Sequence, residues 1–170
     1  MKLVHLTLFF FIASLGVQVK AQAFPWEIFT TRTLKDVDMI TRKAFRPDDS
    51  MFLATKLLET RAEVTFTGES RPISETRKNF IKWWAGSFNY PKDYPDLYAR
   101  EYLYKEGDDE YWLPTEAPIT KYFDKELRPK DKMILYLISI GAYRNKEKVD
   151  CVLLVEEYQL PKPQPSSVSK

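Results

Sequence analysis

The sequence predicts an α+β domain rich in strands, folded as a small five-stranded barrel or as a curled antiparallel sheet with an N-terminal helix. Two hairpin patterns in the second half of the chain support this prediction. The first pairs Tyr98–Lys105 with Glu110–Pro114 across a turn that contains glycine and aspartate. The second pairs Lys132–Ala142 with Asp150–Gln159, and a helical segment, Ala117–Leu127, separates the two hairpins.

Two longer helices are predicted in the first half of the chain. Leu34–Phe45 has apolar residues at helical spacing, and Thr33 and Asp36 before them have the spacing of a capping box. Glu75–Phe88 is the second helix, and Ser74 is placed to cap it. The apolar residues that share one face of this helix are Phe80, Ile81, Trp84 and Phe88.

A strand is predicted between these helices. Leu58–Thr67 alternates apolar and polar residues with a β-branched bias, which is typical of a half-buried strand. Met51–Leu57 fits either the beginning of this strand or a helical turn. Gly68–Pro72 has the composition of a turn, so we expect the strand to end before it.

Without the first helix, the predicted order is a long strand, a helix, a hairpin, a helix and a hairpin. This order resembles that of the OB-fold, a small Greek-key barrel. The resemblance covers Leu57–Gln159, rests on element order alone, and departs at Glu75–Phe88, where the OB-fold usually has a loop. The alternative is an unrelated α+β sheet with the same local order. Lys132–Ala142 is apolar on both faces, so we expect it between two packed layers, one of them the N-terminal helix.

The N-terminus has the pattern of a cleaved secretory signal peptide. Lys2 precedes the apolar run Leu3–Val19, and Ala21–Ala23 supplies a small-residue cleavage site. We therefore predict cleavage after residue 23, with residue 21 as the alternative. Export to the periplasm or the extracellular space follows, without a transmembrane anchor in the mature chain. The absence of an Asn-x-Ser/Thr sequon and the single cysteine favour a bacterial source.

The remaining chain divides into a lead-in with the first helix (24–50), one β-rich domain (51–160) and a flexible tail (161–170). The chain has 26 Lys and Arg against 24 Asp and Glu, and removal of Lys2 and Lys20 leaves 24 of each. A neutral domain lacks the basic excess that nucleic acids and anionic membranes attract, so we expect neither as a partner.

Cleavage also removes His5, the single histidine, which excludes His-based triads and His-ligated zinc or haem in the mature chain. No metal or cofactor is therefore expected. Cys151 has no cysteine to pair with, and its apolar strand predicts a small buried residue, with a reactive thiol as the alternative. The acidic run Asp108–Glu110 is interpreted as turn chemistry and not as a cation site.

The aromatic residues suggest where a ligand would bind. Half of the aromatic residues of the mature chain lie within Phe80–Trp112. Aromatic faces beside an arginine can stack a sugar, a base or a peptide side chain, although the same residues are also typical of cross-strand packing. The predicted ligand-binding residues are Trp83, Arg100, Tyr102, Tyr104 and Trp112.

No catalytic motif identifies a reaction. The sequence contains no Gly-rich phosphate loop, no G-x-S-x-G elbow and no S-x-x-K motif, and it singles out no catalytic residue. The favoured function is a non-enzymatic module that binds a small molecule, a glycan or a protein. The alternatives are a structural or assembly subunit of an envelope complex and a hydrolase that uses carboxylates without histidine.

Overall fold

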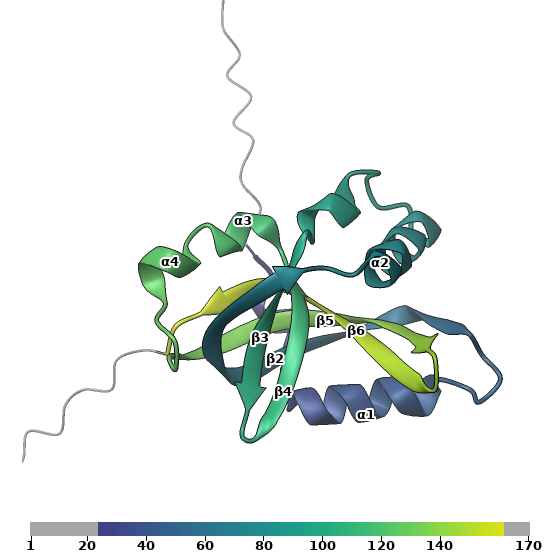
Figure 1. Ribbon diagram of the computed structural model, residues 1–170, viewed down its shortest axis with the longest axis horizontal. Helices are drawn as coiled ribbons and strands as arrows, with labels where there is room; N and C mark the ends of the chain where they lie inside the picture. The colour runs from purple at the N-terminus through teal and green to yellow at the C-terminus, as the bar shows by residue number, and fades with distance from the viewer. Residues whose placement is uncertain (1–23, 162–170) are drawn as a thin grey trace, which may run out of the picture.

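The computed structural model describes residues 24–161, so the predicted signal peptide and all but the first residue of the predicted tail lie outside the described range. The strands are β1 (Thr30–Thr31), β2 (Met51–Pro72), β3 (Arg100–Glu106), β4 (Asp109–Thr115), β5 (Lys132–Asn145) and β6 (Lys148–Gln159). The helices are α1 (Leu34–Ala44), α2 (Glu75–Ser87), α3 (Ala117–Thr120) and α4 (Phe123–Glu126), with single turns η1 (Trp26–Ile28) and η2 (Tyr94–Leu97) (Figure 1). Among these residues, no helix has the length and hydropathy needed to cross a membrane.

Five of the strands close into a barrel. The order β2-β3-β4-β6-β5 returns to β2 because β2 also pairs with β5, and β1 adds to β2 as a short parallel strand. Within the barrel, β4 and β6 are parallel and the other neighbours are antiparallel. The predicted α+β, OB-like barrel is confirmed. The predicted helix at Ala117–Leu127 is present as two short helices, α3 and α4.

Strand β2 is longer than predicted because it pairs with two different strands along its length. It pairs with β5 from Met51 to Thr65 and with β3 from Thr65 to Pro72. The predicted turn at Gly68–Pro72 is wrong: the register shifts there, Gly68 takes a φ of +84°, and the strand continues. A bulge and a turn both favour glycine at positive φ, so composition did not separate them. Met51–Leu57, which the sequence left open, is strand.

The barrel interior is a hydrophobic core to which all five strands contribute. Its strand residues are Ala62, Val64, Phe66, Tyr104, Leu113, Met133, Leu135, Leu137, Leu153 and Val155. Leu34 and Val37 of α1 join this core, as do Ile119 of α3 and Phe123 of α4. Figure 1 shows α1 on one side of the strands and α3 with α4 on the other, so helices cover the barrel interior from both sides.

A second core lies outside the barrel, on the outer face of β5. There Tyr136 and Ile138 pack with Phe80 and Trp84 of α2 and with Phe29 of the lead-in. β5 therefore lies between two apolar layers, as its sequence predicted. The N-terminal helix contributes one of these layers, as expected: α1 packs on the inner face of β5, and α2 and the lead-in cover the outer face.

Helix α1 is fixed at its N-terminus by one predicted contact and one unexpected contact. The Thr33 hydroxyl accepts a hydrogen bond from the Asp36 amide at 3.0 Å, which is the predicted cap. The Leu34 amide donates to the Glu106 carboxylate at 2.9 Å, at the turn between β3 and β4. A carboxylate at a helix N-terminus is stabilised by the helix dipole, so this contact holds α1 against the barrel.

Candidate functional site

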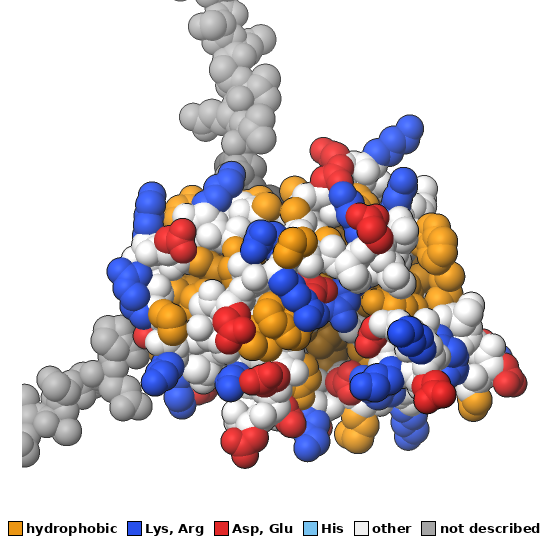
Figure 2. All heavy atoms as spheres, in the orientation of Figure 1, with side chains coloured by type: hydrophobic (Ala, Val, Ile, Leu, Met, Phe, Trp, Pro, Cys, Tyr) orange, Lys and Arg blue, Asp and Glu red, His pale blue; other side chains and the backbone are white. Residues whose placement is uncertain are grey.

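The seam between β4 and β6 is paired at one end and open at the other. In the part of the chain that the structure describes, these two strands pair only at Thr115 and Val155, where the Glu116 amide donates to the Val155 carbonyl at 3.0 Å. Away from this point the strands separate and leave a surface cavity of about 490 Å³. Figure 2 shows it as a hollow with apolar atoms at its base and charged side chains around it.

We name this cavity the β4–β6 groove. Both strands, α1, and two arginines from β2 and α2 surround it. The residues that define it are Glu110–Leu113 of β4, Lys148, Asp150, Cys151 and Leu153 of β6, Asp38 and Arg42 of α1, Arg71 of β2 and Arg77 of α2.

The backbone of β4 directs hydrogen-bonding groups into the groove. In an antiparallel pair, alternate residues direct their N–H and C=O toward the partner strand and the others point away. Arg77 Nη1 donates to the Trp112 carbonyl at 3.0 Å, so Trp112 points away from β3. Glu110 and Pro114 lie two residues on either side of Trp112, so their backbone groups also point away from β3. This agrees with Pro114, which has no N–H to donate to β3. The N–H and C=O groups of Glu110 and Trp112 therefore line the open end of the seam.

The same alternation applies to the facing strand. β5 and β6 are joined by a two-residue turn, which Asn145 and Lys148 close. The residues that direct their backbone away from β5 are then the odd-numbered ones, which agrees with the Val155 carbonyl pointing toward β4. Cys151 and Leu153, which are odd-numbered and line the groove, therefore present their N–H and C=O groups to it from the other side.

A buried ion cluster lies at the rim of the groove. The Glu101 carboxylate is 1% exposed and accepts hydrogen bonds from Arg71 Nε at 2.7 Å and from Arg77 Nη1. Arg77 Nε is buried and has no hydrogen-bond partner within residues 24–161. Burial lowers the pKa of Arg77 and the Glu101 charge raises it, with a net rise, so the guanidinium stays charged. Two cations share one carboxylate here, which leaves one positive charge in excess.

Arg71 and Trp112 form the exposed part of this rim. The Arg71 guanidinium carbon lies 4.1 Å from the centre of the Trp112 ring, a cation–π arrangement. The Arg71 side chain is 49% exposed, so the outer edge of the guanidinium remains accessible to solvent. A planar guanidinium fixed on an aromatic ring is oriented to bind a carboxylate or a phosphate in bidentate fashion.

Two of the predicted ligand-binding residues lie in the barrel interior. Tyr104 is fully buried, and its hydroxyl pairs with the Thr115 hydroxyl at 3.1 Å. Tyr102 packs against the same core. Trp112 lies opposite Leu103 in the β3–β4 ladder and therefore on the other face of the hairpin. The expected common surface of these aromatic residues is not formed, because tyrosines fill the barrel where we expected an exposed face.

The other two predicted residues are exposed but stand apart from the groove. Trp83 is 55% exposed on α2, outside the apolar face that packs on the second core. Arg100 is exposed at the start of β3 and donates to the Ser70 hydroxyl at 2.8 Å. Of the five predicted residues, Trp112 alone lines the groove.

The sequence patterns did not single out Arg71, Arg77 or Glu101. Arg71 fell in a predicted turn and Arg77 on a helix, so neither was assigned to a site. The available signal was Glu101, which shares a strand face with Leu103. A carboxylate on a buried face requires a charged partner, and that requirement could have directed attention to the arginines nearby.

Cys151 lines the groove, and its thiol is protonated at neutral pH. Burial, followed by the nearby Asp38 carboxylate, raises the pKa of the thiol to about 12. Its Sγ lies 3.7 Å from the Asp38 carbonyl oxygen of α1. A thiol that stays protonated at neutral pH is a poor nucleophile, which supports the packing interpretation over a reactive thiol.

Two carboxylates occupy the closed end of the seam. Burial, followed by the charge of Glu116, raises the pKa of Glu156 to about 7. Burial and Glu157 raise the pKa of Glu116 in the same direction. No sequence pattern singles out either residue, because their proximity follows from the β4–β6 pairing. Glu156 therefore changes charge near neutral pH.

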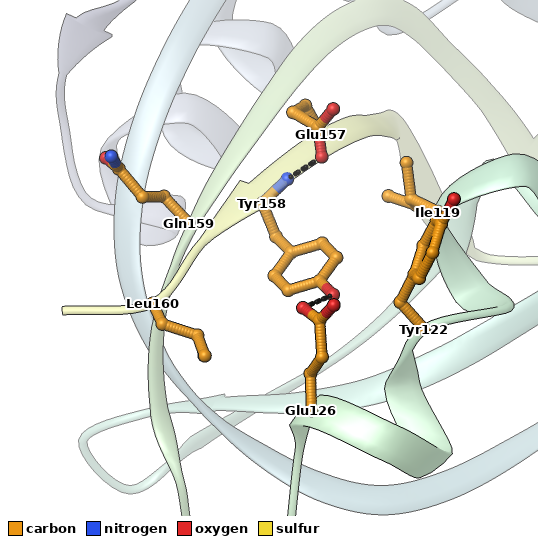
Figure 3. A pocket seen from close by; sticks show the side chains of 7 residues that line it. All are labelled: Ile119, Tyr122, Glu126, Glu157, Tyr158, Gln159 and Leu160. Carbon is orange, nitrogen blue, oxygen red and sulfur yellow. Dashed lines mark hydrogen bonds between the residues drawn. The ribbon is translucent and has the colours of Figure 1, made fainter.

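A second cavity, of about 420 Å³, lies beside α3, α4 and the end of β6 (Figure 3). Within it, the Tyr158 hydroxyl donates to Glu126 at 2.6 Å, and Tyr122 and Leu160 line the sides. Among the described residues, no arginine or lysine lines this cavity and only one strand borders it, whereas the β4–β6 groove lies between two strands. We therefore place the candidate site in the β4–β6 groove.

Residues 24–161 contain no cluster of three or more His, Cys, Asp or Glu side chains arranged to hold a metal ion. Comparisons of the chain with protein-family models, with curated proteins and with solved structures gave no match. The interpretation of the groove therefore depends on its geometry and chemistry.

Proposed function

We propose that the chain is an exported binding module that holds its ligand in the β4–β6 groove. The observation that supports this most is the open seam: pairing stops at Thr115 and Val155, and beyond it both strands direct polar backbone groups into a cavity of about 490 Å³. A strand edge with unpaired N–H and C=O groups can form hydrogen bonds with a partner.

The chemistry of the rim supports the same proposal. Arg71 and Arg77 carry one positive charge beyond that of Glu101, and Trp112 offers an aromatic surface under Arg71. By analogy with the OB-fold, the strands equivalent to β3 and β4 and the connections beside them form the ligand face. Trp112 and the α2 residue Arg77 occupy those positions.

Fluorine NMR of the mature chain labelled with 5-fluorotryptophan tests this proposal. The chain has four tryptophans, and single Trp→Phe variants assign their signals. Titration with a panel of glycans, peptide pools and small carboxylates or phosphates should shift the Trp112 signal and leave that of Trp83 unchanged. Arg71→Gln should weaken the response, whereas Arg100→Gln, outside the groove, should not. No response at Trp112 to any member of the panel, or a response at Trp83 alone, would contradict the proposal.

Export is the other part of the proposal, and the signal-peptide pattern of residues 1–23 supports it. Expression of the full chain in a bacterium, followed by N-terminal sequencing of the protein from the periplasm or medium, should give Phe24 as the first residue. Recovery of the uncleaved chain in the cytoplasm would contradict it.

An assembly subunit would bury the first helix and the two-sided apolar strand β5 against a partner, but both have partners within the chain. The outer face of β5 packs against α2 and Phe29, and the buried residues Leu34 and Val37 of α1 lie in the barrel core. Neither apolar surface therefore requires a second protein.

A further inference from the structure

The ligand class that the groove fits best is a polypeptide in extended conformation. We infer that a short peptide with an acidic residue near one end binds as an added strand between β4 and β6, with its carboxylate held by Arg71 and Arg77. This inference rests on the proposed function and specifies the partner of the same site.

Hydrogen-bond complementarity is the first argument. The groove presents the N–H and C=O groups of Glu110 and the N–H of Trp112 on one side, since Arg77 holds the Trp112 carbonyl, and those of Cys151 and Leu153 on the other. These groups repeat at every second residue, which is the spacing that an extended peptide backbone offers. A sugar or a small anion has no such repeat. Addition of a strand to an open edge satisfies these groups through main-chain hydrogen bonds.

The position of the arginines supplies the second argument. Arg77 Nη1 already bonds the Trp112 carbonyl and therefore closes one end of the open β4 edge. Beside it, Arg71 is stacked on Trp112 with its outer edge in solvent. A strand that runs along the groove reaches these cations at its end. Elsewhere the groove lining carries Asp38, Glu110 and Asp150 against Arg42 and Lys148, so the positive charge is confined to the arginine end. There it is complementary to one acidic side chain or a terminal carboxylate.

The base of the groove supplies the third argument. Leu113 and Leu153 line it from the two strands, and Tyr111 packs against the barrel core beside them. Side chains of a strand alternate between two faces, so every second residue of the peptide would contact this apolar base. The expected peptide therefore combines small apolar residues at alternate positions with an acidic residue near one end.

A displayed library of random linear heptapeptides, selected against the mature chain, tests the inference. We expect selected peptides to bind the wild-type chain and to lose about tenfold in affinity with Arg71→Gln. Arg100→Gln, a change of the same kind outside the groove, should leave the affinity within about twofold. Unchanged thermal unfolding of both variants would show that the loss does not come from unfolding.

Backbone methylation then separates strand pairing from other modes of peptide binding. Two sets of N-methylated peptides are compared, one methylated at odd-numbered residues and one at even-numbered residues. The set whose N–H groups face the strand edge should lose about tenfold in affinity, and the other set should change by less than about twofold. The bound peptide should also slow amide exchange at Glu110 and Trp112, or at Cys151 and Leu153. Binding without parity dependence, or without protection of either edge, would overturn strand addition and leave the proposed function intact.

Failure of the inference can be told apart from failure of the proposed function. Selection of no peptide, together with a Trp112 fluorine shift caused by a glycan or a small anion, would overturn the peptide partner alone. Selection of no peptide and no Trp112 response to any ligand would overturn both.

Discussion

The two ends of the β4–β6 seam differ in pairing, charge and expected role. At the closed end, Thr115 pairs with Val155, and the carboxylates of Glu116 and Glu156 lie beside the junction. At the open end the strands separate, and two arginines share the Glu101 carboxylate at the rim. The same two strands thus complete the barrel at one end and leave polar edges available at the other. Substitutions at the closed end should change stability, and substitutions at the groove rim should change binding.

The largest effect is expected from Arg77→Met, which removes one partner of the buried Glu101. Loss of one member of a buried ion cluster leaves an undercompensated charge, so the free energy of unfolding should fall by about 3 kcal/mol. Urea titration measures this loss. Arg100→Met, at an exposed site, is the matched control and should change stability by less than about 0.5 kcal/mol. A loss below about 1 kcal/mol for Arg77→Met would show that the cluster does not hold the rim.

The next effect comes from Glu156→Gln at the closed end and depends on pH. The folded pKa of Glu156, about 7, exceeds the ordinary carboxyl value, so the folded state binds the proton more tightly than the unfolded state. The folded protein therefore loses stability as the pH rises toward 7, and the cost is complete above it. Glu156→Gln should raise the free energy of unfolding by about 2 kcal/mol at pH 8 and change it little at pH 4.

The control for this pH dependence is Glu147→Gln, in the exposed turn between β5 and β6. It should have no comparable effect on the difference in stability between pH 4 and pH 8. An equal gain at both pH values for Glu156→Gln would mean that the titration of this carboxylate is not the cause.

A smaller effect is expected from Tyr104→Phe, which keeps the ring in the barrel and removes the hydroxyl bonded to Thr115. Loss of one buried hydrogen bond should lower the free energy of unfolding by about 1 kcal/mol. Since Tyr104 is fully buried, ligand affinity should not change. Thermal unfolding and the Trp112 fluorine titration measure the two quantities. A large loss of affinity without loss of stability would return Tyr104 to the ligand site.

The smallest effect on stability is expected from Trp112→Leu. The partly exposed ring contributes a cation–π contact with Arg71, so the free energy of unfolding should fall by less than about 1 kcal/mol. Affinity for a groove ligand should nevertheless fall about tenfold, because the substitution removes the surface that orients Arg71. Isothermal titration with a selected peptide or other identified ligand measures the change. The same loss of affinity in a Trp83→Leu variant would show that the ligand binds at α2 and not in the groove.

The element order and the helix caps were predictable from the sequence because they depend on local patterns. Thr33 caps α1 as expected, and both faces of β5 are buried as its apolar residues required. The bulge at Gly68 was not predictable from composition, because the same residues suit a turn. The face of β3 that points inward was also ambiguous, because Tyr102 and Leu103 are both suited to a core.

The groove itself could not be predicted from the sequence because it depends on where two distant strands stop pairing. β4 and β6 are separated by α3, α4 and β5 in the chain, and their register has no local signal. The ion cluster is similarly long-range, since Arg71, Arg77 and Glu101 come from three elements. Trp112 was singled out for its aromatic ring, and the residues around it became visible only in the folded chain.

Amide hydrogen exchange along β4 and β6 of the ligand-free mature chain tests the open seam most directly. The amides of Glu110, Trp112 and Cys151, which point into the groove, should exchange much faster than those of Val155 and Glu116 at the paired end. Tyr111 and Leu113, bonded to β3, should be slow and serve as internal controls. Equally slow exchange of Glu110, Trp112, Val155 and Glu116 would show that the seam is closed along its length and would contradict the proposed binding site.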